Sequence, residues 1–188
     1  MGRWQPNARG RLEQAALDLY VERGFAQTTV TEIAGRAGLT ERTFFRHFAD
    51  KREVLFSGSA ELQELLVAAV TGAPEGAAPI DAVAAGLDTV GGLMQERRPF
   101  ALRRQSVITA NTELQERELI KLAALAAATA AALHRRGVAE PAASLAAEAG
   151  IAVFRIAFER WVGGPDDSEL AQLMRESLAE LKAVTAGR

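Results

Sequence analysis

Residues 29–56 contain two short apolar-periodic segments separated by Gly38. In the first segment Ile33 and Ala37 lie four residues apart, on one face of an amphipathic helix. Glycine adopts positive φ without steric cost, so Gly38 is expected to end this helix and turn the chain. Thr40 then suits the N-cap of a second helix that starts at about this residue. The segment is therefore predicted to be a helix-turn-helix.

The second helix of the pair is predicted to have one buried face and several exposed ones. Phe44 and Phe48 lie four residues apart and can both enter the core. The side chains left on more exposed faces are Glu41, Arg42, Thr43, Phe45, Arg46 and His47. In the major groove the first turn of such a helix meets base edges. We therefore expect Arg42 and Thr43 to contact bases, with Arg42 bidentate to a guanine.

Basic residues near this helix are candidates for contacts with the phosphate backbone. His47 and Lys51 are expected near phosphates. The alternative for each polar residue is an ordinary solvated helix face, and for Lys51, Arg46 and Arg52 taken singly this alternative stays open. Residues 1–56 hold nine Lys or Arg against seven Asp or Glu, whereas residues 57–188 hold thirteen against seventeen. This asymmetry has the sign expected if the amino-terminal part faces phosphate, although chance explains so small a difference equally well.

The rest of the chain also has helical periodicity. A first helix is expected over residues 8–23, ended by Gly24, and a longer one begins near the N-cap candidate Asp50. A Gly/Pro cluster within residues 72–79 ends that longer helix. Further helices are expected over residues 81–98, 100–109, 113–136, 141–161 and 168–184. No strand-like alternation bounded by turns occurs, so the predicted fold class is all-α.

Composition excludes several classes of function. The chain has no cysteine and only two histidines, His47 and His134, so we expect no metal site and no cofactor. It has no phosphate loop, dinucleotide glycine pattern or nucleophile elbow, so we expect no catalytic residues and no enzyme. It has neither a signal peptide nor an uninterrupted apolar stretch of roughly 20 residues. We therefore expect a cytoplasmic protein with no membrane partner.

Residues 9–56 resemble the DNA-binding domain of TetR-family transcriptional regulators. Members of this family are all-helical dimers that usually repress transcription and are released from DNA by a small ligand. The resemblance implies that Thr29 and Thr31 begin the positioning helix and that residues 40–48 form the recognition helix. It also implies that Lys51 opens the helix that leads to the second domain.

One position departs from the family pattern. The family commonly has Tyr where this chain has Phe45, and the phenol hydroxyl normally reaches a phosphate. Phe45 offers only an apolar contact, to a thymine methyl group or to the sugar backbone. The predicted DNA-binding residues are Thr29, Thr31, Thr40, Glu41, Arg42, Thr43, Phe45, Arg46, His47 and Lys51.

The resemblance also implies two domains and a homodimer. A helix-turn-helix DNA-binding domain is expected over residues 1–50 and a helical effector-binding and dimerisation domain over residues 51–188. In this family the last two helices pair with their copies, which here would be residues 142–161 and 168–184. Their apolar positions suit an intramolecular core and a dimer interface equally well. A dimer also matches the two half-sites of a palindromic double-stranded DNA operator.

The effector pocket of this family lies among the helices that here span residues 81–161. No fixed motif marks that pocket, so we nominate polar or bulky side chains within apolar helices. The predicted effector-binding residues are Thr89, Met94, Gln95, Arg104, Gln105, Ile108, Phe154, Arg155, Phe158 and Trp161.

Four of these candidates lie close together in sequence, near the end of one predicted helix. Phe154, Phe158 and Trp161 share a face that can stack a planar or hydrophobic effector. Ordinary core or dimer packing explains the same spacing and is the favoured interpretation for each. Arg155 can pair with an anionic ligand or with an acidic neighbour such as Glu159, one turn further along.

The resemblance implies a TetR-like transcriptional repressor, which binds a palindromic operator as a homodimer and is released by a small-molecule effector. The alternative is a helical adaptor that binds only protein and uses the helix-turn-helix as a scaffold. The exposed polar and aromatic side chains expected on the second helix argue against the adaptor.

Overall fold

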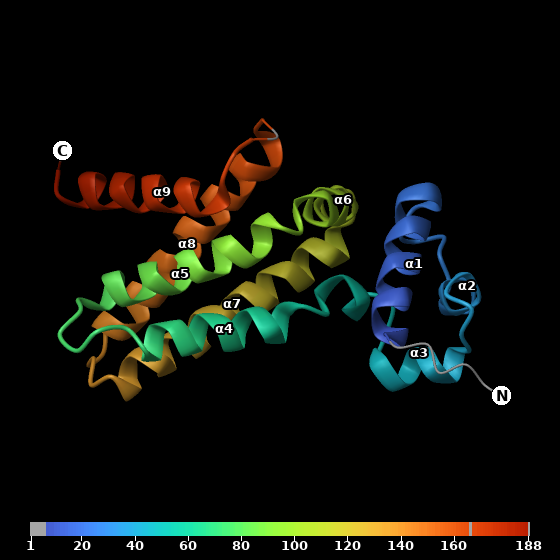
Figure 1. The fold of residues 1–188 in the computed structure, drawn as a ribbon, viewed down its shortest axis with the longest axis horizontal. Coiled ribbons are helices and arrows are strands. Elements are labelled where there is room, and N and C mark those ends of the chain that lie inside the picture. Colours follow the sequence, from blue (N-terminus) through green and yellow to red (C-terminus); the bar gives the residue numbers. More distant parts are fainter. Residues whose placement is uncertain (1–6, 166, 188) are drawn as a thin grey trace. The chain divides into compact units, whose positions relative to one another are not determined.

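The computed structural model describes residues 7–165 and 167–187, and within them every regular element is a helix (Figure 1). The predicted all-α fold class is confirmed. The elements in chain order are α1 (Ala8–Arg23), α2 (Val30–Arg36), α3 (Glu41–His47), the 3-10 helix η1 (Glu53–Phe56), α4 (Ser59–Thr71), α5 (Pro79–Gln95), α6 (Arg98–Thr109), α7 (Thr112–Arg135), α8 (Ala142–Gly163) and α9 (Leu170–Thr185).

The chain divides into two compact units. The first unit runs to Ser59 and also contains Leu102–Glu118, while the second contains Ala60–Ala101 and the chain from Leu119 onward. We call Leu102–Glu118 the α6–α7 elbow, because it comprises most of α6, the following turn and the first turns of α7. The first unit is therefore discontinuous in sequence. The predicted domain boundary after residue 50 stays a prediction.

Several helices begin elsewhere than the sequence predicted. The helix expected from Asp50 is replaced by η1 and, after a short break, α4. The Asp50 carboxylate still acts as a local cap, because it accepts hydrogen bonds from the backbone N–H groups of Arg52 (2.8 Å) and Glu53 (3.1 Å). Pro79, expected to end a helix, instead opens α5, where its missing N–H has no intrahelical partner to lose.

The first unit has an apolar core drawn from each of its helices and from the elbow. Its fully buried side chains include Leu12, Leu17, Leu19, Phe25, Ile33, Phe44, Ile108 and Leu114. Complete burial of each such side chain contributes about 1.5–3 kcal/mol relative to exposure. This core fixes α3 by one face and leaves its other faces to solvent.

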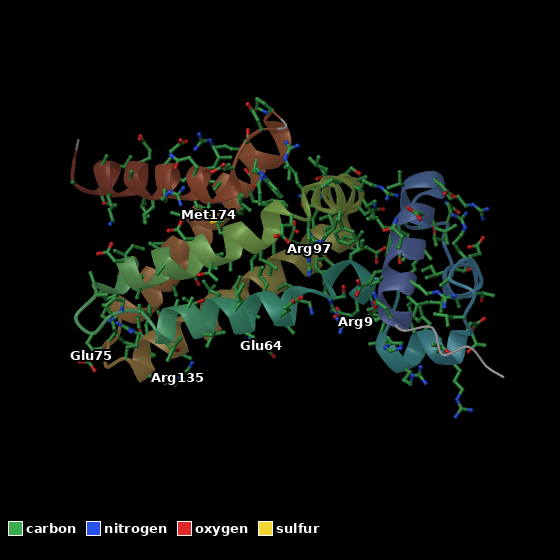
Figure 2. All side chains as sticks on the ribbon, viewed as in Figure 1. Arg9, Glu64, Glu75, Arg97, Arg135 and Met174 are labelled. Atoms are coloured by element: carbon green, nitrogen blue, oxygen red, sulfur yellow. The ribbon has the colours of Figure 1, made fainter. Side chains whose placement is uncertain are left out.

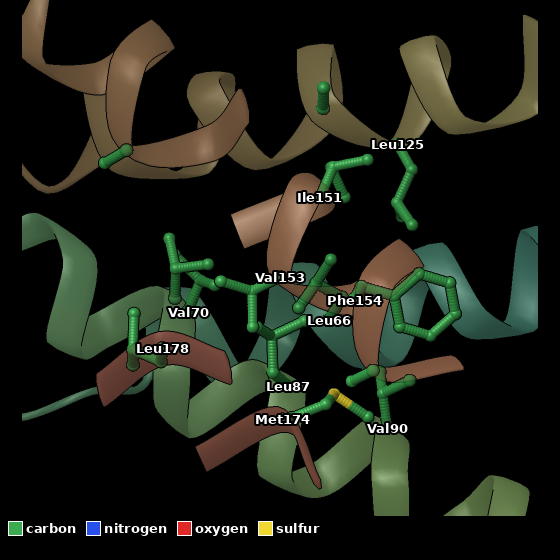
Figure 3. Close-up of a cluster of buried hydrophobic side chains, with 14 of the residues drawn as sticks. Leu66, Val70, Leu87, Val90, Leu125, Ile151, Val153, Phe154, Met174 and Leu178 are labelled. Atoms are coloured by element: carbon green, nitrogen blue, oxygen red, sulfur yellow. The ribbon is translucent and has the colours of Figure 1, made fainter. Parts of the chain in front are cut away.

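The second unit is held together by α4, α5, α7, α8 and α9 around a second apolar core. Figure 3 shows part of this cluster, with side chains from all five helices meeting between the ribbons. Glycine permits two close helix approaches here. A Cβ on Gly91 of α5 would lie 2.9 Å from the Cα atom of Ala171 on α9, and one on Gly150 of α8 would meet Val83 of α5. Both glycines are therefore required for close packing rather than for a turn.

One stretch, Glu53–Thr71, is long and apolar enough by length and composition alone to cross a membrane. It comprises η1 and α4, and it carries Glu61 and Glu64 on exposed positions. Leu66 and Val70 of α4 are fully buried in the apolar core of the second unit. This pattern is that of an amphipathic core helix.

Candidate nucleic-acid interface

The helix-turn-helix begins with a capping box at α2. The Thr29 hydroxyl accepts a hydrogen bond from the Glu32 N–H (3.3 Å), and the Glu32 carboxylate accepts one from the Thr29 N–H (2.9 Å). This reciprocal arrangement satisfies two backbone donors that a helix start leaves without intrahelical partners. Of the two threonines expected to begin this helix, Thr29 is the cap. Its hydroxyl is therefore engaged within its own helix.

A glycine turn connects α2 to α3. Gly38 has φ of 63°, in the left-handed region, and the Leu39 N–H then donates to the Ala34 carbonyl at 2.8 Å. Thr40 caps α3 by accepting a hydrogen bond from the Thr43 N–H at 3.2 Å. The predicted turn at Gly38 and the predicted cap at Thr40 are both confirmed. The direction in which α3 leaves the turn is thus set by local interactions among a few consecutive residues.

Two aromatic side chains anchor α3 in the core of the first unit. Phe44 is fully buried and Phe48 nearly so, with their ring centroids 5.5 Å apart. On the other faces Arg42, Phe45, Arg46 and His47 are exposed, and the Phe45 side chain is 56% exposed. Arg42, Thr43, Phe45 and Arg46 line a shallow surface depression. The predicted division of this helix into buried and exposed faces is confirmed.

The amino-terminal ends of α2 and α3 are joined by a side-chain hydrogen bond. The Thr31 hydroxyl donates to the Glu41 carboxylate at 2.6 Å. Both residues are exposed, so one oxygen of Glu41 is held in place while its carboxylate remains accessible to solvent. The bond connects the predicted positioning helix to the start of the predicted recognition helix.

Arg9 of α1 supports the end of α3. Its guanidinium lies 5.8 Å from the centroid of the Phe48 ring and donates to the Ser57 carbonyl at 2.5 Å. It also pairs with Glu13 one turn further along α1, at 3.1 Å. Figure 2 labels Arg9 on its helix. Sequence reasoning gave no sign of these contacts, because two of the three join residues far apart in the chain.

Lys51, predicted to lie near a phosphate, is engaged inside the first unit. Its ammonium donates to the carbonyl oxygens of Phe25 (2.9 Å), Ala26 (3.3 Å) and Thr28 (2.9 Å). It also lies 4.5 Å from the centroid of the Phe25 ring. An ammonium group has three N–H donors, and these acceptors use all three. A phosphate contact would require Lys51 to leave the loop between α1 and α2.

A buried tyrosine completes the attachment of this loop. The Tyr20 hydroxyl donates to the Lys51 carbonyl oxygen at 2.6 Å, and its ring meets the Phe25 ring edge-on at 5.1 Å between centroids. Burial raises the pKa of Tyr20 above its ordinary value, and the Asp50 carboxylate adds to the shift. The phenol is therefore neutral at physiological pH and remains a hydrogen-bond donor. Tyr20 and Lys51 together fix the segment that follows α3.

The ten predicted effector-binding residues are distributed over both compact units. Arg104, Gln105 and Ile108 lie in the α6–α7 elbow and hence in the first unit, whereas the other seven lie in the second. Ile108 is fully buried, and the side-chain oxygen of Gln105 is buried without a hydrogen-bond partner among the described residues. The effector role of all ten residues stays a prediction.

Arg104 attaches the elbow to η1. Its Nε donates to the Leu55 carbonyl (2.7 Å), its Nη1 pairs with Glu118 (3.0 Å), and its guanidinium lies 4.9 Å from the Phe56 ring centroid. Burial lowers the pKa of the guanidinium below its ordinary value, and the Glu118 carboxylate opposes that shift. These contacts give Arg104 a structural role that the sequence did not reveal.

Gln95 and Trp161 bind the turn between α8 and α9. The Gln95 side chain donates to the Ser168 carbonyl at 3.1 Å and accepts from the Leu170 N–H at 3.0 Å, at the start of α9. The indole N–H of Trp161 donates to the same Ser168 carbonyl at 3.2 Å. Arg98 adds donors to the Trp161 and Gly164 carbonyls at the end of α8. The end of α5 is thus tied to the start of α9, and the start of α6 to the end of α8.

The remaining candidates of the second unit divide into core and surface. Phe154 and Phe158 are almost fully buried and stack at 5.9 Å between centroids, within the apolar core that Met94 also contacts. On the surface, Thr89 donates its hydroxyl to a carbonyl of its own helix. Arg155 is exposed and lies 3.5 Å from Glu159, so the ion pair considered from the sequence is present.

Two protein families match this sequence. Residues 13–57 match the family described as bacterial regulatory proteins, tetR family. Residues 77–186, more than half of the chain, match the family described as the MftR C-terminal domain. The chain is also 35% identical over 88 residues to the HTH-type transcriptional regulator TcmR of Streptomyces glaucescens. That alignment covers 47% of this chain and 39% of the length of TcmR.

Solved structures with the same fold include regulators with bound ligands. FadR of Thermus thermophilus, a TetR-family transcriptional repressor in complex with lauroyl-CoA, has 22% identity and a TM-score of 0.56, with 91% of each chain covered. The SmeT–triclosan complex has 19% identity and a TM-score of 0.65, covering 92% of this chain and 90% of SmeT. FadR of Bacillus subtilis with stearoyl-CoA has 19% identity and a TM-score of 0.61, covering 90% and 95%. At these identities the likeness establishes the fold alone.

Proposed function

Because the chain belongs to the TetR family of bacterial transcriptional regulators, we propose that it is a cytoplasmic repressor that binds a palindromic operator as a homodimer. The observation that carries this proposal is the exposed surface of α3. A helix fixed by Phe44 and Phe48 places Arg42, Phe45 and Arg46 in solvent. Such a helix has the size and chemistry to enter a major groove.

The exposed residues of α3 divide by position into two roles. Arg42 lies in the first turn, where side chains of a recognition helix meet base edges, and its planar guanidinium suits the two acceptors of a guanine. Arg46 and His47 lie in the last turn, where backbone phosphates are the nearer partners. Glu41, which accepts a hydrogen bond from Thr31, is our candidate to accept another from the amino group of a cytosine.

Substitutions at Arg42 and Arg46 should separate these roles. Arg42→Ala is expected to weaken operator binding by about 1–3 kcal/mol and to relax specificity, with little change on random DNA. Arg46→Ala is expected to weaken operator and random DNA alike and to reduce the salt slope of log K by about one unit. Binding of both variants to both duplexes across a salt series measures these effects. Equal losses on operator and random DNA for Arg42→Ala would contradict its base contact.

An exposed apolar stripe on α8 supports the homodimer. Leu145, Ala149, Ala152 and Ile156 recur with helical spacing, and Leu145 and Ile156 are among the exposed large apolar side chains of the chain. The two alanines between them permit a close approach of a second helix. The apolar surface of such a stripe stays in contact with water unless another chain covers it.

The double variant Leu145→Glu/Ile156→Glu is therefore expected to shift the protein from dimer to monomer. Buried carboxylates facing their own copies repel one another and lose hydration. Sedimentation velocity measures the change, and a control is Val21→Glu, which places one such carboxylate on an exposed apolar position of α1. A double variant that remains dimeric at micromolar concentration contradicts this interface.

We further propose that a small molecule bound in the second unit releases the operator. Related structures carry lauroyl-CoA, stearoyl-CoA or triclosan, so the fold accommodates ligands of very different size. An effector lowers operator affinity only by its difference in affinity for the two conformational states. Helices α4, α6 and α7 continue from one unit into the other, so they are the connections through which the change reaches the helix-turn-helix.

The first test is a mobility-shift titration against DNA selected from a random library, with unselected duplex as competitor. The proposal expects saturable, competitor-resistant binding to a two-fold symmetric sequence. Selection that enriches no sequence, and binding no tighter than to random duplex, would contradict it. Protein capture without DNA specificity would then favour the helical adaptor, in which the helix-turn-helix serves as scaffold.

A further inference from the structure

We propose that Phe45 recognises a thymine in each operator half-site through the 5-methyl group of that base. This inference rests on the proposed function, since it requires that α3 enters the major groove. It assigns a partner to the one large apolar side chain on the exposed surface of α3.

The Phe45 ring is exposed but firmly supported. It meets the Phe44 ring edge-on, with 5.4 Å between centroids and 83° between planes. Phe44 is fully buried and packs in turn against Phe48. A ring has only two side-chain torsions, so little conformational entropy remains to be lost when it contacts a ligand. Phe45 therefore presents a largely preformed apolar surface.

Charged neighbours restrict which part of DNA this ring can meet. Arg42 lies one turn before Phe45, and Arg46 directly follows it. All three side chains line the same depression. The guanidinium groups suit anionic phosphates and base acceptors. A benzene ring has no donor for phosphate and would only remove water from it, which is unfavourable. Among the base edges of the major groove, the thymine 5-methyl is the apolar group.

The position of Phe45 on the helix favours a base over the backbone. Side chains three and four residues apart on a helix lie side by side, so Phe45 neighbours Arg42, the residue proposed to contact a base edge. A thymine close to the guanine contacted by Arg42 is therefore within reach of the ring. Burial of one methyl group against the ring is worth about fourfold in affinity.

Deoxyuridine substitution tests this directly, because it removes the methyl group and leaves base pairing intact. Each thymine of the selected operator is replaced in turn by deoxyuridine, symmetrically in both half-sites, and titrated with wild type, Phe45→Ala and Phe45→Tyr. Wild type is expected to lose about fourfold per half-site at one thymine position and little elsewhere. Phe45→Tyr, which keeps the ring, should retain that loss, whereas Phe45→Ala should bind both duplexes equally. Thermal unfolding of each variant confirms that this exposed position leaves the fold intact.

The possible failures are distinguishable. If wild type binds the operator specifically but no thymine position responds to deoxyuridine, Phe45 reads no methyl group and the inference is overturned. The same conclusion follows if Phe45→Ala keeps the methyl dependence of wild type. If wild type enriches no DNA sequence at all, the proposed function fails and this inference fails with it.

Discussion

Arg104→Met is expected to lower the free energy of unfolding by about 2–4 kcal/mol, near the lower end of what breaking a buried ion pair costs. The substitution removes the partner of Glu118 and the donor to the Leu55 carbonyl. The two charged side chains are only 19% and 25% exposed, so water compensates the remaining carboxylate incompletely. Urea denaturation without effector measures the loss.

Arg103 provides a matched control on the same helix. Its guanidinium pairs with Asp18 of α1 at 2.5 Å, but these side chains are 39% and 31% exposed. Exposed ion pairs contribute about 0–1 kcal/mol, so Arg103→Met should be nearly neutral. Adding Glu118→Gln to Arg104→Met should recover part of the lost stability, because no carboxylate is then left without a partner.

The Arg104→Met variant also separates two roles for Arg104, when its stability is compared with its response to effector. The sequence predicts that it binds an effector, whereas its contacts in the first unit indicate that it attaches the α6–α7 elbow to η1. A variant with wild-type stability that no longer responds to effector would support the ligand role and contradict the structural one. A destabilised variant whose effector response, measured well below its unfolding transition, equals that of wild type would do the reverse.

The parts of the fold that sequence predicts well are those set by short-range interactions. Thr29 and Thr40 cap helices by binding backbone groups three residues away, and Gly38 turns the chain by its own φ. Phe44 and Phe48 define the buried face of α3 through their i, i+4 spacing. Each of these signals lies within a few residues, so the helix-turn-helix and its exposed surface follow from residue types alone.

The contacts that the sequence did not predict involve backbone groups far along the chain. Lys51 donates to a carbonyl 23 residues away and Arg104 to one 49 residues away. Gln95 accepts from a backbone N–H that is 75 residues away. Every residue carries a carbonyl and almost every one an N–H, so such partners leave no mark in the pattern of residue types. A polar residue within an apolar helix therefore suggests a ligand site even where the fold itself uses it.

The pair of helices assigned to dimerisation illustrates a third kind of limit. Only burial separates core from surface among the apolar positions of α8: Val153 is buried, while Leu145 and Ile156 are exposed. Helical spacing places residues on a face, but it does not say what covers that face. The exposed stripe on α8 is the observation that supports the proposed homodimer.

Lys51→Met is expected to lower the free energy of unfolding by about 2–3 kcal/mol, because three carbonyls lose a charged donor in a partly buried loop. Its sequence-based role predicts something else, namely uniform weakening on all DNA and a salt slope smaller by about one unit. Because all three ammonium protons already have acceptors, we expect the salt slope to remain that of wild type.

Arg46→Ala is the counterpart for this test, since it removes an exposed charge from α3 and should change the salt slope without changing stability. Thermal unfolding and salt-dependent binding of both variants, with binding measured well below the unfolding transition, give a two-by-two comparison. A smaller salt slope for Lys51→Met at unchanged stability would mean that DNA draws the ammonium away from the loop. A stability loss with an unchanged slope assigns Lys51 to the fold, and leaves the exposed residues of α3 as the principal phosphate contacts of the helix-turn-helix.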